Sequence, residues 1–174
     1  MTEVSRPLQS PAVTPAVASA LDTLVRMVER AGEFRASILL LSDDRRHLLD
    51  AAGPSLPAEY RSAIHGLEIG PDAGSCGTAA WLNDLVVVGD IARDPRWDRY
   101  RHLALPHGLA ACWSQPIRGR DGAVLGTFAM YYAEPREPST PELEAIATAA
   151  ARAGVIIENA RAGTGRAGLV EELA

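Results

Sequence analysis

Residues 72–83, with the sequence DAGSCGTAAWLN, constrain the fold more than any other part of the chain. Gly74 and Gly77 stand among small residues at the start of a run that is typical of a helix, and Cys76 lies between them. Residues without a Cβ allow tight turns and a close approach of the backbone to neighbouring groups. The unpaired N–H groups at a helix N-terminus favour an anion or a thiolate. We therefore expect Cys76 to lie at the start of a helix and to belong to a site.

A second segment, residues 108–117 (GLAACWSQPI), is typical of a buried strand and carries Cys112, the other cysteine of the chain. The stretch between the two segments, residues 90–108, is irregular and contains aromatic, histidine and arginine side chains. Aspartates alternate with its arginines, which is typical of a solvated loop of mixed charge. We expect this stretch to form one wall of a pocket and to act as a mobile lid over it.

Short apolar runs bounded by turn residues predict strands, and longer runs with helical spacing predict helices. Ser139 and Glu142 stand three residues apart, as in a capping box at a helix N-terminus. Gly163 and Gly165 are expected to end the last helix. The expected strands cover residues 36–41, 47–52, 86–88, 110–116 and 124–132, and the expected helices cover residues 15–31, 57–64, 78–82, 98–105 and 140–160.

Apolar residues recur at spacings of three and four along the first and the last helix. Such stripes suit pairing between two subunits, and they suit packing on the sheet of the same chain equally well. We expect a homodimer through these helices, with packing inside one chain as the other interpretation. The stripes contain Val17, Leu21, Leu24, Val28 and Ala31 in the first helix, and Leu143, Ile146, Ala150, Ala153, Ile157 and Ala160 in the last.

The order of the motifs GSCGTAA, VVVGDIARDP, HGLAACWSQPI and GAVLGTFAMYY resembles that of GAF domains, the small-molecule-binding sensor domains of bacterial signalling proteins. The resemblance covers about residues 16–160. It implies an α+β fold with a central antiparallel sheet of five to six strands. It also implies that the N- and C-terminal helices lie on one face of the sheet, and that loops and short helices form a pocket on the other.

The chain has 174 residues, a length typical of one domain with a core that needs no disulfide or metal. We divide it into a disordered leader rich in Ser, Thr and Pro (residues 1–15), a GAF domain (residues 16–161) and a C-terminal tail (residues 162–174). The leader lacks the basic and apolar regions of a signal peptide.

The net charge of −5 argues against nucleic acid or an anionic membrane as the main partner. No apolar run approaches the ~20 residues that a membrane span requires. Two cysteines without an export signal indicate a cytoplasmic location, where both would be free thiols. Their spacing does not fit a zinc site built from paired CxxC motifs, and we expect no metal site.

The candidate ligand-binding side chains come from the glycine-rich segment, from the predicted pocket wall and from the neighbouring strands. Each also has a purely structural interpretation, since cysteine often acts as a small apolar core residue and aromatic rings often fill cores. No Ser-His-Asp arrangement, GxGxxG motif or Walker motif is present, so we expect no catalytic residues. The candidates are Cys76, Trp97, Tyr100, His102, His107, Cys112, Trp113 and Tyr131.

One alternative follows from a similarity to the free methionine-(R)-sulfoxide reductases, which are GAF enzymes. In this resemblance Cys76 corresponds to one of their cysteines. Their essential nucleophile lies in a His-Ile-Ala-Cys-like segment, whereas the corresponding residues 91–97 here contain no cysteine. Cys112 would have to replace it. The alternative is therefore a thiol redox sensor, or a reductase-like enzyme, that uses Cys76 and Cys112.

A second alternative is a haem sensor, because His102 and His107 lie in the expected pocket wall and His is the commonest haem ligand in sensors. In bilin-binding GAF domains of the phytochrome type, the Cys-His attachment motif would fall on Arg99 and Tyr100, so no covalent bilin is expected. The NKFDE-type motif of cyclic-nucleotide-binding GAF domains is also absent. The leading hypothesis is a sensory domain that binds a small molecule and signals to an output domain or partner. The ligand and any cofactor stay open, and a purely structural dimerisation module is a third hypothesis.

Overall fold

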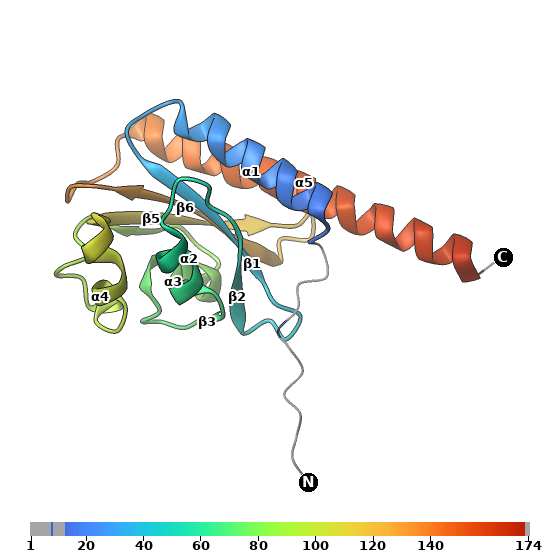
Figure 1. Ribbon diagram of the computed structural model, residues 1–174, viewed down its shortest axis with the longest axis horizontal. Coiled ribbons are helices and arrows are strands. Elements are labelled where there is room, and N and C mark those ends of the chain that lie inside the picture. Colours follow the sequence, from blue (N-terminus) through green and yellow to red (C-terminus); the bar gives the residue numbers. More distant parts are fainter. Residues whose placement is uncertain (1–7, 9–12, 173–174) are drawn as a thin grey trace, which may run out of the picture.

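The computed structural model describes residue 8 and residues 13–172, with side chains as far as residue 164. In this part of the chain, six antiparallel strands form one sheet in the order β3-β2-β1-β6-β5-β4. Helices α1 and α5 lie side by side across one face of the sheet, and the shorter helices lie on the other (Figure 1). The predicted α+β architecture, with terminal helices on one face, is confirmed.

The strands match the predicted runs, apart from one two-residue strand that the sequence patterns missed. That strand, β3, is too short to show any alternation of its own. The sheet is centred on β1 and β6, which pair antiparallel with Leu39 opposite Thr127. The strands are β1 (Arg35–Leu41), β2 (His47–Ala52), β3 (Leu67–Glu68), β4 (Val86–Val88), β5 (Ala111–Arg118) and β6 (Val124–Tyr132).

The helices begin where the capping residues predict. The side chain of Thr14 accepts a hydrogen bond from the backbone N–H of Val17 at 3.3 Å. At the last helix, the backbone N–H of Ser139 donates to the carboxylate of Glu142 at 2.8 Å, which is one of the two hydrogen bonds of a capping box. The helices are α1 (Pro15–Glu29), α2 (Ala58–Ile64), α3 (Gly74–Leu82), α4 (Arg101–Ala104) and α5 (Thr140–Glu172), with 3-10 turns η1 (Pro95–Trp97) and η2 (Leu105–His107).

The predicted end of the last helix at Gly163 and Gly165 is wrong. Helix α5 continues through both glycines to Glu172 and extends past the body of the domain (Figure 1). Glycine disfavours a helix by about 1 kcal/mol relative to Ala, but it leaves the backbone hydrogen bonds possible, and no proline follows. The predicted leader lies largely outside the described residues, and the division of the chain at residues 15 and 161 stays a prediction.

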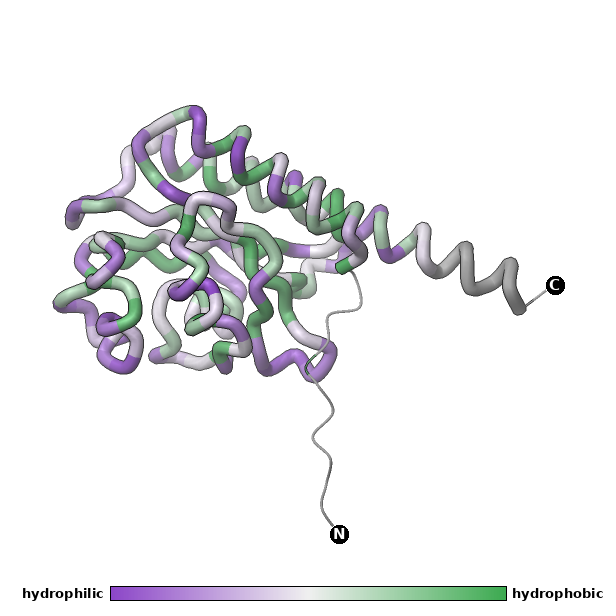
Figure 2. The backbone as a smooth tube through the Cα atoms, viewed as in Figure 1, coloured by the Kyte–Doolittle hydropathy of each residue, from purple (hydrophilic) through white to green (hydrophobic). Residues whose placement is uncertain are grey.

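The core on the helical face accounts for the apolar stripes of α1 and α5. Leu21, Leu24, Ala153 and Ile157 are buried there against the sheet of the same chain. The apolar segments in Figure 2 accordingly follow the strands and the sides of the two long helices that face them. These side chains are therefore not available for a dimer contact. Of the two interpretations of the stripes, the structure supports packing within one chain.

On the other face, α3 lies close to the sheet because both surfaces are built from small residues. A Cβ added to Gly77 would lie only 2.5 Å from the Cβ of Ala73, so the first turn of α3 has no room for a larger residue. On the face of the sheet that α3 covers, Ser114 on β5 stands opposite Ala129 on β6. This close contact brings the N-terminus of α3 directly onto the sheet.

Candidate functional site

Cys76 lies in the first turn of α3, as predicted, and its side chain faces the sheet. The residue is 6% exposed, and its Sγ lies 4.0 Å from the hydroxyl oxygen of Tyr131. Tyr131 on β6 is the register partner of Cys112 on β5, so both side chains project from the same face of the sheet. The structure therefore brings together three of the predicted residues between α3 and the sheet.

Hydrogen bonds connect this cluster to the elements above it. The hydroxyl of Ser75 donates to the backbone carbonyl of Cys112 at 2.9 Å, and the indole N–H of Trp97 donates to the Ser75 hydroxyl oxygen at 3.0 Å. From α2, the hydroxyl of Tyr60 donates to that of Tyr131 at 3.1 Å. Ser75 and Tyr60 were not among the predicted residues. Ser75 adjoins Cys76 in sequence, but no local pattern marks Tyr60, which reaches the site only through the packing of α2.

A cavity of about 20 Å³ lies above the cluster. That volume corresponds to a single water molecule. The protein's own aromatic rings line this space and leave it nearly closed, so the ligand pocket stays a prediction. The lining residues are Leu39, Tyr60, Ile64, Leu67, Ala73, Gly74, Ser75, Cys76, Trp97, Tyr100 and Tyr131.

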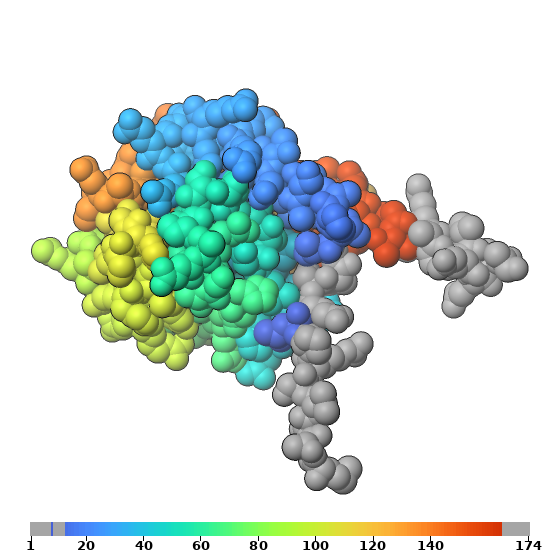
Figure 3. All heavy atoms as spheres, in the orientation of Figure 1, coloured from blue at the N-terminus to red at the C-terminus, as the bar shows by residue number. Residues whose placement is uncertain are grey.

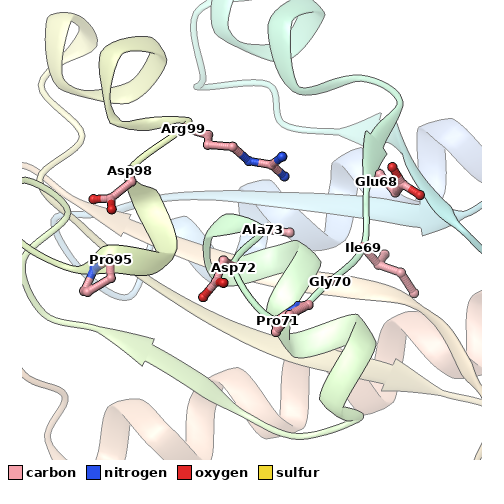
Figure 4. A pocket seen from close by; sticks show the side chains of 9 residues that line it. All are labelled: Glu68, Ile69, Gly70, Pro71, Asp72, Ala73, Pro95, Asp98 and Arg99. Carbon is pink, nitrogen blue, oxygen red and sulfur yellow. The ribbon is translucent and has the colours of Figure 1, made fainter.

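An outer cleft of about 540 Å³ lies next to this cavity. Residues 68–73 form one side of the cleft, and Pro95, Asp98 and Arg99 form the other (Figure 4). The Arg99 side chain extends across the opening toward residues 68–73 (Figure 4). Ala73 lines both the cleft and the inner cavity. The boundary between solvent and cavity is therefore formed by two segments, residues 67–74 and residues 95–100.

Residues 90–108 form short, hydrogen-bonded turns rather than an irregular loop. Arg96 pairs with the carboxylate of Asp94 at 2.6 Å and donates to the backbone carbonyl of Val87 at 3.3 Å. Arg101 donates to the backbone carbonyl of Asp94 at 3.0 Å. The alternating charges predicted from the sequence are therefore satisfied largely within the segment itself. In Figure 3 this segment, drawn in yellow and yellow-green, covers one side of the molecule beside α2.

The remaining candidates lie at different distances from the cavity. Trp113 lies on the opposite face of the sheet, 4.3 Å from Tyr132 between ring centroids, within the core under α1 and α5. Adjacent residues on a strand point to opposite faces, so Trp113 points away from the face on which Cys112 packs with Cys76. The proposal that Trp113 contacts a ligand is therefore wrong. Tyr100 is half-buried and lines the cavity.

Neither histidine lines the cavity. His102 is exposed on α4. His107 is half-buried, with its Nε2 atom 3.9 Å from the carboxylate of Glu59. With His102 exposed and a cavity of about 20 Å³, the residues present do not fit a haem in this site. In the described part of the chain, no group of three or more His, Cys, Asp or Glu side chains is arranged to hold a metal ion.

The two thiols differ in acidity although both are buried. The hydrogen bond from the Cys112 thiol is the main cause that lowers the pKa of Cys76, to about 7, against the opposing effect of burial. The hydroxyls of Ser114, Thr127 and Tyr131 lower the Cys76 pKa further. Burial raises the pKa of Cys112 well above its ordinary value. The site therefore favours ionisation of Cys76 over ionisation of Cys112.

Comparison with known proteins places this arrangement in a family. A family model described as the GAF domain matches residues 15–158. The chain belongs to the GAF domain family. A similar relative is the methyl sulfide methyltransferase-associated sensor of Methanosarcina acetivorans, which is 38% identical over 149 residues, covering 83% of this chain. The aligned region is 15% of that relative's length, so this GAF domain corresponds to a small part of it.

Solved structures show the same fold at low sequence identity. The GAF domain from a phosphoenolpyruvate-protein phosphotransferase of Coxiella burnetii superposes with a TM-score of 0.71 at 17% identity, covering 88% of this chain and 89% of that one. The free methionine-R-sulfoxide reductase of Neisseria meningitidis, solved with its substrate, gives a TM-score of 0.69 at 18% identity, covering 84% and 81%. At this identity the likeness establishes the GAF fold alone. Among the described residues, no helix has both the length and the apolar character of a membrane span.

Proposed function

We propose that this GAF domain is a sensory module that binds a small molecule in the cavity beneath Trp97 and Tyr100. One observation carries the proposal: a nearly closed cavity with hydroxyl and thiol groups at its floor lies behind two segments that also line an open cleft. A core built only for stability would fill such a space with apolar side chains, because buried polar groups cost free energy unless they are paired. The cavity therefore corresponds to the closed state of a binding site.

The lining of the cavity defines the chemistry of the ligand. Its walls are apolar or aromatic, its floor carries the hydroxyls of Tyr60 and Tyr131, and no Asp, Glu, Lys or Arg lines it. Such a surface suits a small neutral molecule with one hydrogen-bonding group and one apolar side. Binding requires Trp97 to move toward the outer cleft, and apolar burial at about 25 cal/mol per Å² offsets the cost of that movement.

A route for the signal leads through the sheet to the long helices. Tyr131 lines the cavity and Cys112 lies beside it on the same face of the sheet, while their neighbours Tyr132 and Trp113 belong to the core under α1 and α5. A shift of β5 and β6 at the cavity would therefore move the surface on which α5 packs. We propose that α5, which extends past the body, passes this shift to an output domain or partner. A homodimer is part of the proposal, and its contact would use exposed side chains such as Val155.

A screen of small neutral compounds by native mass spectrometry, followed by titration, tests the binding site. A compound that binds in the inner cavity should lose about fivefold in affinity in Tyr131→Phe, which removes one hydrogen bond worth about 1 kcal/mol. Asp98→Asn in the outer cleft is the matched control and should leave the affinity unchanged. The proposal fails if Asp98→Asn weakens binding and Tyr131→Phe does not, or if no compound binds the folded protein.

A further inference from the structure

We propose that Cys76 and Cys112 form a reversible redox pair, in which a small hydroperoxide entering the cavity oxidises Cys76 and Cys112 then closes an intramolecular disulfide. This function is separate from the proposed sensing of a neutral ligand, since it requires only the two thiols and an oxidant of the peroxide class. Four features of the site carry the inference: the position of Cys76, the adjacent thiol, two unpaired hydroxyls and the size of the cavity.

The two sulfurs lie within one buried cluster. Cys76 lines the cavity with its Sγ atom 4.0 Å from the Tyr131 hydroxyl oxygen, and Cys112 is the register partner of Tyr131 on the same face of the sheet. The hydrogen bond from the Ser75 hydroxyl to the Cys112 carbonyl, at 2.9 Å, holds the first turn of α3 against β5 at this point. The reacting partners are therefore positioned by backbone elements on both sides, the first turn of α3 and the start of β5.

Two unpaired hydroxyls indicate that the site is built for a negative charge at Cys76. Ser114 and Thr127 are fully buried on the sheet face beneath α3, and neither hydroxyl has a hydrogen-bond partner in the described part of the chain. Both lower the pKa of Cys76. A neutral thiol leaves these donors unused at an energetic cost, whereas a thiolate or the oxygen of an oxidised sulfur gives them an acceptor. The helix N-terminus adds to this preference for the anion.

The size of the cavity selects the oxidant. A space of about 20 Å³ admits a molecule near the size of water, and the two segments that cover it need to separate only slightly for hydrogen peroxide. A disulfide of glutathione size would require Trp97 and Tyr100 to leave the site. We therefore expect fast reaction with hydrogen peroxide and slow reaction with bulky disulfides.

The chemistry balances in two steps. The Cys76 thiolate attacks one peroxide oxygen, the O–O bond breaks, and the products are a Cys76 sulfenic acid and hydroxide, which takes up a proton to become water. The Cys112 thiol then loses its proton and attacks the Cys76 sulfur, which forms the S–S bond and releases the sulfenic oxygen as a second water. Two thiols are oxidised and one peroxide is reduced to two waters. A thiol reductant returns the disulfide to two thiols.

The test is a reaction of the reduced full chain with one equivalent of hydrogen peroxide, quenched by alkylation and read by intact mass. The wild type should lose two hydrogens as a monomer and regain them with dithiothreitol. Cys112→Ser should stop at a sulfenic acid that dimedone traps on residue 76, and Cys76→Ser should react at least tenfold more slowly. The absence of a disulfide in the folded wild type, or a disulfide only between two chains, would overturn the proposal.

The hydroxyls provide a matched pair of variants. Ser114→Ala should slow the oxidation about tenfold and move the midpoint of its pH dependence upward from about 7. Ser37→Ala removes another buried, unpaired hydroxyl from the same face of the sheet, but that group does not act on Cys76, so it should change neither quantity. Circular dichroism verifies that each variant is folded. Equal effects of the two substitutions would assign both hydroxyls to stability and would contradict the role of Ser114.

Discussion

Replacing Ile157 with Glu should unfold the domain, with a loss of more than about 4 kcal/mol in the free energy of unfolding. Ile157 is fully buried on α5 against the sheet, so a carboxylate there would lie in an apolar core without a partner. The expected result in urea denaturation is a midpoint near zero denaturant, or a protein without cooperative unfolding.

Val155→Glu is the control for this prediction because it places the same charge on the same helix. Val155 is 57% exposed, so its replacement should change stability by no more than about 0.5 kcal/mol. A folded Ile157→Glu protein that has only changed from dimer to monomer would show that the stripe forms a subunit contact. In that case the placement of α5 on its own sheet would be wrong.

Replacing Trp97 with Ala should cost about 3–5 kcal/mol, the range for removing a large buried aromatic side chain. Trp97 is 3% exposed, and its indole N–H donates to the Ser75 hydroxyl, which in turn donates to the carbonyl of Cys112. The substitution also joins the inner cavity to the outer cleft. Alkylation of Cys76 in the folded protein should therefore become faster, even under conditions where the unfolded population is negligible.

Two further tryptophan variants separate the stability lost with the buried ring from the stability lost with its N–H donor. Trp81→Ala removes a side chain that is 53% exposed at the end of α3, so its effect should stay within about 0.5 kcal/mol. Trp97→Phe keeps a ring in the cavity and removes the N–H donor, so its cost should fall between the other two, at about 1–2 kcal/mol. If Trp97→Ala costs no more than Trp81→Ala, Trp97 does not close the cavity.

The strands and the terminal helices were predictable because their signals are local. The run at β1 and the capping box at Ser139 each depend on a few neighbouring residues, and both elements form where expected. The end of α5 was not predictable from Gly163 and Gly165, because glycine only weakens a helix. The two-residue strand β3 was missed since its existence depends on pairing with β2 rather than on its own sequence.

The candidate site was predictable only in part, because a side chain's neighbours across the fold leave no local signal. Cys76 was identified from its glycine-rich segment, and Cys112 from its strand. Because side chains alternate along that strand, Cys112 and Trp113 lie on opposite faces of the sheet. Which of the two lies near the cavity depends on which face of the sheet α3 covers. The unpaired hydroxyls of Ser114 and Thr127 could not have been predicted, since serine and threonine are common in strands and only the contact with α3 leaves them buried.

Hydrogen exchange of the ligand-free protein tests the central claim that the cavity is the closed state of a binding site, because the expected lid, residues 90–108, must then open. The backbone N–H of Trp97 donates to the carbonyl of Asp94 at 3.0 Å, so its exchange requires this segment to open. We expect the amides of residues 90–108 to exchange together and much faster than those of β5 and β6, and to be slowed by a bound compound. Exchange across residues 90–108 that is as slow as that of the central strands would contradict the claim.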